Sequence, residues 1–142
     1  MKSKKLSDST VLIFETGEEF ASTLTQFAKE HRISAGHFTA IGAFSDVSLG
    51  YFDWEKKDYL RNEVKEQIEV VSLIGDIALD KGSPKVHAHV VVGRRDGSAM
   101  AGHLMSGRVR PTLELVLEDS AGRLQRRFDP ESGLALIDLE TN

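Results

Sequence analysis

The chain has 142 residues, a formal net charge of −4 and no cysteine, which fits one domain whose core is large enough to need no covalent cross-link. The lack of cysteine excludes disulfides, thiolate metal sites and a cysteine nucleophile and fits a reducing compartment, while the acidic charge argues against a nucleic-acid binder with a broadly basic surface. Because no apolar run follows the lysines at the start of the chain, we expect no signal peptide and no membrane segment, and therefore a cytoplasmic protein.

The first predicted elements are a strand and a helix. The apolar run from Val11 to Phe14 indicates an opening strand. Thr16 and Glu19 then have the spacing of a capping box, in which each residue caps a backbone N–H of the other. Apolar residues follow at helical spacing, so we predict one amphipathic helix over residues 18 to 31.

The rest of the chain has the pattern of strands. Strand-like segments are predicted over residues 35–54, 58–79, 85–93, 99–109, 112–118 and 124–128. Pro111 is expected to open the segment 112–118, in which leucines alternate with polar residues. The second half of 58–79 is apolar at odd and even positions, as in a central strand. Together these elements predict a single α+β domain.

Two histidines share one face of a predicted strand. His87 and His89 are two positions apart, and side chains alternate along a strand, so both lie opposite the valines of that segment. The position of His103 depends on the loop that joins residues 85–93 to 99–109. A two-residue turn at Asp96-Gly97 would set His103 across from Val90, on the other face.

A three-residue loop at Arg95-Asp96-Gly97 would instead set His103 directly across from His89. We predict this loop, because Gly97 suits the left-handed position that ends such a connection. Facing residues have Cβ atoms about 5 Å apart, which lets two imidazoles share one ion.

Three neutral imidazoles with an open fourth position form a recurrent zinc site. We therefore predict that His87, His89 and His103 bind a divalent metal, with zinc the first choice, although nickel, copper or iron also suits imidazole nitrogen. Glu114, on the polar face of the next predicted strand, could be a fourth ligand, an orienting partner or a general base. The alternative is that the histidines are unrelated and partly exposed.

Three motifs carry a family resemblance. They are Gly42 to Asp53 (GAFSDVSLGYFD), Ser72 to Ile77 (SLIGDI), and the His-x-His pair followed by Gly102-His103. Together they resemble the signature of the plant and prokaryote conserved (PPC) domain. The resemblance spans about residues 9–128, and leaves residues 1–8 and 129–142 as expected terminal tails.

The resemblance implies a mostly antiparallel sheet packed by one main helix, and a homotrimer. In prokaryotic members, the histidines that match His87, His89 and His103 are thought to bind a metal. Plant members are nuclear proteins in which a separate AT-hook grips DNA while the domain assembles partners. The nearest match to an AT-hook here, Gly107 to Pro111, lacks the adjacent Arg-Pro and is interpreted as part of a strand.

These observations leave three functions open. We rank first a binding or regulatory module, a trimer that holds a metal, has room for a small-molecule ligand and acts through partners or DNA. A metal-dependent hydrolase or lyase ranks second, with Glu114 as its possible base. A structural trimer with incidental histidines ranks last. A basic cluster near the C-terminus could touch phosphate or form surface ion pairs; it consists of Arg123, Arg126 and Arg127.

Overall fold

The computed structural model describes residues 1–140, which form nine strands and one α-helix, and confirms the α+β class. The helix α1 spans Phe20–Glu30. The strands are β1 Lys2–Lys5, β2 Thr10–Glu15, β3 Ala35–Asp53, β4 Asp58–Val64, β5 Ile68–Asp80, β6 Ser83–Gly93, β7 Ala99–Asp119, β8 Gln125–Phe128 and β9 Ala135–Asp138. No helix in the described part of the chain is long and apolar enough to cross a membrane.

All strands belong to one bent sheet, and its pairing is antiparallel except for a single parallel contact between β5 and β8. The main order is β1-β2-β7-β3-β5-β8-β9, and β4 extends the far half of β3. Strand β6 pairs with both β5 and β7. The sheet is therefore curved so that it closes on itself: β3 pairs with β5, β5 with β6, β6 with β7, and β7 again with β3.

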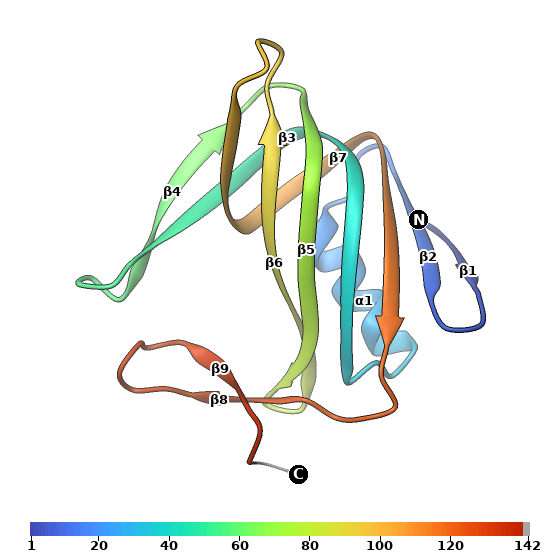
Figure 1. Cartoon of the computed structure of the whole chain (residues 1–142), viewed down its shortest axis with the longest axis vertical. Coiled ribbons are helices and arrows are strands. Elements are labelled where there is room, and N and C mark those ends of the chain that lie inside the picture. Colours follow the sequence, from blue (N-terminus) through green and yellow to red (C-terminus); the bar gives the residue numbers. More distant parts are fainter. Residues whose placement is uncertain (141–142) are drawn as a thin grey trace.

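The concave face of this sheet holds the core. Helix α1 lies against that face (Figure 1), with its apolar stripe fully or almost fully buried. The alternating leucines of β7 point the same way, since Leu113, Leu115 and Leu117 have no exposed surface. Burying one such side chain contributes about 1.5–3 kcal/mol, so the period-two pattern fixes which face of each strand points outward.

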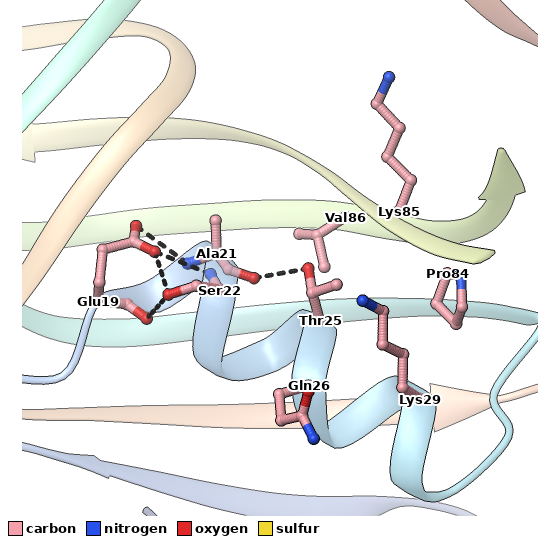
Figure 2. Close-up of a pocket in the computed structure, with 9 residues that line it drawn as sticks. All are labelled: Glu19, Ala21, Ser22, Thr25, Gln26, Lys29, Pro84, Lys85 and Val86. Atoms are coloured by element: carbon pink, nitrogen blue, oxygen red, sulfur yellow. Dashed lines mark hydrogen bonds between the residues drawn. The ribbon is translucent and has the colours of Figure 1, made fainter.

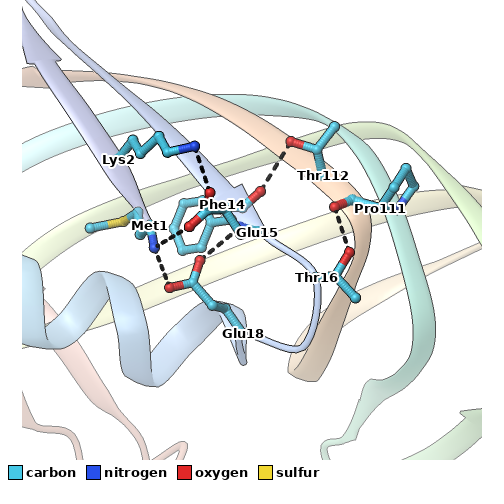
Figure 3. A network of polar contacts seen from close by, with 8 residues as sticks. All are labelled: Met1, Lys2, Phe14, Glu15, Thr16, Glu18, Pro111 and Thr112. Carbon is cyan, nitrogen blue, oxygen red and sulfur yellow. Dashed lines mark hydrogen bonds and ion pairs between the residues drawn. The ribbon is translucent and has the colours of Figure 1, made fainter.

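The helix begins differently from the predicted capping box. Glu19, rather than Thr16, is the N-cap, and its carboxylate accepts from the backbone N–H groups of Ala21 (3.2 Å) and Ser22 (2.8 Å). Thr16 instead donates to the carbonyl of Pro111, 2.9 Å away, and so ties the turn before the helix to β7 (Figure 3). The prediction failed because a carboxylate closer to the helix satisfies the same free N–H groups.

The two strands predicted over residues 99–109 and 112–118 are one long strand, so Pro111 lies inside β7 and does not open a strand. Its missing N–H is tolerated because the pairing with β3 shifts there, between Val109 and Leu113. The segment predicted over 58–79 divides into β4 and β5.

Parts of both expected tails also belong to the sheet. Lys2–Lys5 pairs with β2, and Ala135–Asp138 pairs with β8. The Met1 amine contacts Glu18 at 2.5 Å and Glu15 at 3.4 Å beside this edge (Figure 3). The resulting β8–β9 hairpin crosses the end of β5 (Figure 1).

Candidate metal centre

The loop between β6 and β7 sets the register of the candidate site. The N–H of Arg94 donates to the carbonyl of Ser98 at 2.8 Å, and Gly97 has a φ of +84°. This is the predicted three-residue loop, and it places His89 directly across from His103. The predicted register is therefore confirmed.

Three imidazoles meet on the outward face of β6 and β7. Each of the three pairs of ring centroids is 5.2 to 5.4 Å apart, and one nitrogen from each ring lies within 4.8 Å of the other two. Nitrogens bound to one zinc lie about 3.3 Å apart, because each zinc–nitrogen bond is about 2 Å long. Small rotations of the rings would close this difference. The cluster consists of His87, His89 and His103.

The surroundings favour neutral rings at physiological pH. Burial, together with positive charge on His87 and His89, lowers the pKa of His103 to about 4. Burial and the charge of His87 also lower the pKa of His89. A metal ligand must be an unprotonated imidazole, so these two side chains are already in the binding form.

His103 carries the clearest sign of a missing partner. Its Nδ1 atom is buried and has no hydrogen-bond partner within residues 1–140, and a buried polar atom without a partner costs about 1–3 kcal/mol. The cost would disappear if an ion or a ligand met this ring. The donor set therefore fits a borderline-soft divalent metal such as zinc.

Asp76 lies behind His87 and was not identified from the sequence. The two-residue turn at Lys81-Gly82 joins β5 to β6 and pairs Asp76 with His87. The Oδ2 atom of Asp76 is 3.3 Å from Nδ1 of His87, which leaves Nε2 as the free nitrogen of that ring. Burial alone would raise the pKa of Asp76, but His87 and Arg126 outweigh it and lower the pKa. The signal that could have revealed Asp76 was this Lys-Gly turn.

Tyr59 covers the other side of the cluster. Its ring stacks on His103, with centroids 4.8 Å apart, and burial raises the pKa of its phenol. Tyr59 lies on β4, beyond β3, and its ring reaches His103 across Gly50 of β3, where a Cβ would lie 2.8 Å from the Tyr59 ring. The alternation of side chains along a single strand could not predict this contact, because the two residues lie on strands that are not neighbours.

Glu114 does not reach the cluster. It lies eleven residues beyond His103 on β7, across from Ile41 on β3 and Ile13 on β2. His103, by contrast, lies across from His89 and Gly50. The expected role of Glu114 assumed a new strand after Pro111, whereas Glu114 lies on the same strand as His103 and is carried away from the histidines along β7.

The outward face is hollowed beside the histidines. An open hollow of about 430 Å³ is bordered by His87 and His89 together with Thr39 and Ile74. A neighbouring hollow of about 370 Å³ shares Ile74 and is otherwise largely apolar. Four side chains that line this second hollow are exposed despite being apolar: Ile41 (60%), Val71 (57%), Ile74 (56%) and Val116 (42%).

A third hollow lies elsewhere, between α1 and β6, and holds none of the three histidines. Its volume is about 570 Å³, and Lys29 and Lys85 border it (Figure 2). Glu19, at its end, is already occupied with the backbone and side chain of Ser22. The charged groups that border this groove are therefore two lysines and a glutamate that already has hydrogen-bond partners.

The fold has counterparts in known proteins. The family model of the Plants and Prokaryotes Conserved (PCC) domain matches residues 1–120; it is the family, also written PPC, that the sequence motifs resemble. No curated protein matches the sequence.

Three solved structures are similar over nearly the whole chain. A "putative DNA binding protein" of Bacteroides thetaiotaomicron is 33% identical, with a TM-score of 0.95 over 99% of this chain and 98% of its own. A metal-containing protein of Archaeoglobus fulgidus is 34% identical, with a TM-score of 0.85 over 94% of both chains. A PPC protein of Pyrococcus horikoshii is 31% identical, with a TM-score of 0.87 over 99% of this chain and 96% of its own.

Proposed function

Because the chain belongs to the plant and prokaryote conserved domain family, we propose that it is a cytoplasmic, trimeric module that holds a metal and acts by binding partners. The observation that carries this proposal is the meeting of three imidazoles in one cluster, in which the buried Nδ1 of His103 has no hydrogen-bond partner among the described residues. The similarity to a metal-containing protein of Archaeoglobus fulgidus supports it.

Zinc is the metal that we propose. Zinc accepts three neutral imidazoles as ligands, with a fourth position left for water or another ligand. The hollow beside His87 and His89 gives a small molecule access to that position. When bound, the ion would supply a Lewis acid, while Asp76 and Tyr59 hold the rings of His87 and His103 in place.

The proposed trimer uses the apolar hollow on the outward face. Thr39 pairs with Ile74 on one side and Val116 on the other, so the exposed apolar residues form one continuous surface across β3, β5 and β7. Exposed apolar surfaces of this kind mark contacts between proteins. We propose that a second copy of the chain covers this surface.

Binding to DNA is the second candidate function. It is supported by the similarity to the Bacteroides protein whose name includes DNA binding. The net charge of −4 means that any contact with phosphate must come from a local patch. Affinity for a DNA duplex that falls steeply with salt would support this function, whereas affinity that is absent at low salt would exclude it.

A hydrolase or lyase is not proposed. The base assigned to it, Glu114, lies away from the histidines. Asp76 does contact His87, but its pKa is lowered and Arg126 holds its other oxygen, so it is a poor proton acceptor. A binding module accounts for the site without a general base.

Titration with cobalt tests the proposed function. Chelator-treated protein should bind one Co²⁺ per chain and develop the visible absorption of a four-coordinate ion, and zinc should then displace it. The substitution His89→Ala should abolish the spectrum, while His37→Ala, which changes an exposed histidine outside the cluster, should leave it intact. No saturable spectrum in the wild type would overturn the proposal.

A further inference from the structure

The C-terminal hairpin, residues 125–138, meets the rest of the sheet through a small number of polar contacts. Its backbone joins β5 at one position, Leu79 opposite Gln125. The side-chain amide of Gln125 donates to the carbonyl of Leu79 at 3.3 Å. An ion pair between Arg126 and Asp76 also joins the hairpin to β5.

Arg126 is the most deeply placed charge of this hairpin. Its side chain is 7% exposed. One guanidinium nitrogen donates to Oδ1 of Asp76, and the other donates to the carbonyl of Ala135 on β9, 3.2 Å away. A single guanidinium thus joins both strands of the hairpin to β5. A buried arginine requires such partners, because removing either would leave an uncompensated charge.

The same carboxylate reaches the histidine cluster. While Oδ1 of Asp76 accepts from Arg126, Oδ2 faces Nδ1 of His87 at 3.3 Å. Arg126, Asp76 and His87 therefore form a continuous chain of polar contacts from the hairpin to the candidate metal centre. A carboxylate that accepts from a histidine fixes its tautomer and ring orientation for a metal on the other nitrogen.

We propose that Arg126 and Asp76 are positioning residues for the metal centre, and that metal binding and docking of the C-terminal hairpin stabilise each other. This inference rests on the proposed metal site. When the hairpin is docked, Arg126 holds Asp76, and Asp76 turns Nε2 of His87 toward the other two imidazoles. When metal is bound, the ring of His87 is held in place. The carboxylate of Asp76, which contacts this ring, then stays where it can accept a hydrogen bond from Arg126.

Thermodynamic linkage makes the two effects equal. If docking of the hairpin raises metal affinity by a given factor, metal binding must favour docking by the same factor. The inference therefore has two independent measurements, one at the metal centre and one in the hairpin.

The first measurement is zinc affinity by competition with a chromophoric chelator. Arg126→Gln and Asp76→Asn should each weaken zinc binding by about 10- to 100-fold, the usual effect of losing a residue that orients a ligand. Their combination should cost no more than the larger single effect, because both act through one contact chain. Arg126→Lys keeps the charge and should recover part of the affinity.

Arg127→Gln is the matched control. Arg127 is the next residue of β8, is 61% exposed and pairs with Asp138 within the hairpin at 2.7 Å. It does not contact Asp76. Its substitution should leave zinc affinity within about twofold of the wild type, which separates the proposed contact chain from any general disturbance of the hairpin.

The second measurement is amide hydrogen exchange of residues 125–138 with and without zinc. Zinc should slow exchange there in the wild type and have little effect in Arg126→Gln. The inference would be overturned if zinc affinity were unchanged in Arg126→Gln and Asp76→Asn, or if amide exchange in the hairpin were the same with and without zinc. Neither result would count against the metal site itself. A wild type that binds no zinc would overturn the proposed function itself.

Discussion

Asp76 lies directly across from His87 in the β5–β6 pair, and its carboxylate oxygen is 3.3 Å from the imidazole nitrogen. The acid at this site is thus supplied by the strand before the histidines. Glu114, eleven residues farther along the strand that carries His103, is paired elsewhere in the sheet. Asp76 therefore holds the ring of His87 on one side of the cluster, and Tyr59 holds the ring of His103 on the other.

Gly75 makes the close packing behind the cluster possible. A Cβ at this position would lie 2.3 Å from the carbonyl oxygen of His87 and 2.5 Å from the ring of Phe38. We expect Gly75→Ala to lower the free energy of unfolding by about 1–3 kcal/mol, the usual cost of overpacking. Urea unfolding measures this. Gly122→Ala, where a Cβ would meet nothing within 4 Å, should change stability little, and equal losses in both variants would contradict the packing argument.

The stability of the metal-free protein should fall as the pH falls. The pKa of His103 in the folded chain is lowered to about 4, while an unfolded histidine titrates near 6.5. Between these values the unfolded state binds the proton and the folded state does not, so unfolding becomes easier as the pH decreases from about 6.5 to 4. The lowered pKa of His89 acts in the same direction.

Unfolding by urea in the presence of chelator, at a series of pH values, measures this dependence. The variant His103→Gln should show a shallower slope over the same range. An unchanged slope would mean that His103 titrates alike in the folded and unfolded chain.

Glu114→Gln should leave metal binding unaltered. Glu114 lies across from Ile41 and borders the apolar hollow, away from the imidazoles. Zinc affinity within about twofold of the wild type is the expected result. A tenfold loss would show that Glu114 acts on the site after all, for example from a neighbouring copy of the chain.

The oligomer should depend on the apolar surface of β3 and β5. Val71 is 57% exposed there, and a charge buried against a second copy would be left without a partner. We expect Val71→Lys to shift the sedimenting species from trimer to monomer. Leu6→Lys changes an exposed apolar residue in the turn between β1 and β2 and should leave the trimer intact; dissociation in both variants would point to a different interface.

The local pattern of the sequence was enough to place the three histidines relative to one another. The alternation in β6 put two of them on one face, and the loop that ends at Gly97 determined the register of the third. These features depend only on strand periodicity and on turn geometry, both of which can be read from consecutive residues.

The remaining contacts depend on how distant parts of the sheet meet. Tyr59 reaches His103 across Gly50 of the intervening strand β3, and Arg126 reaches Asp76 because the C-terminal hairpin folds back over β5. For Arg126 the sequence suggested contact with phosphate or a surface ion pair, and not the ion pair with Asp76. Glu114 was misplaced because a proline usually ends a strand, whereas Pro111 lies at a shift in register within one long strand.

Elemental analysis of tag-free protein tests the central claim most directly. The account predicts one transition metal per chain in the wild type and in His37→Ala, and none in His103→Ala, which removes a ligand whose Nδ1 has no other partner. Protein that carries no metal and fails to take up added zinc, or His103→Ala that retains a full complement, would contradict it.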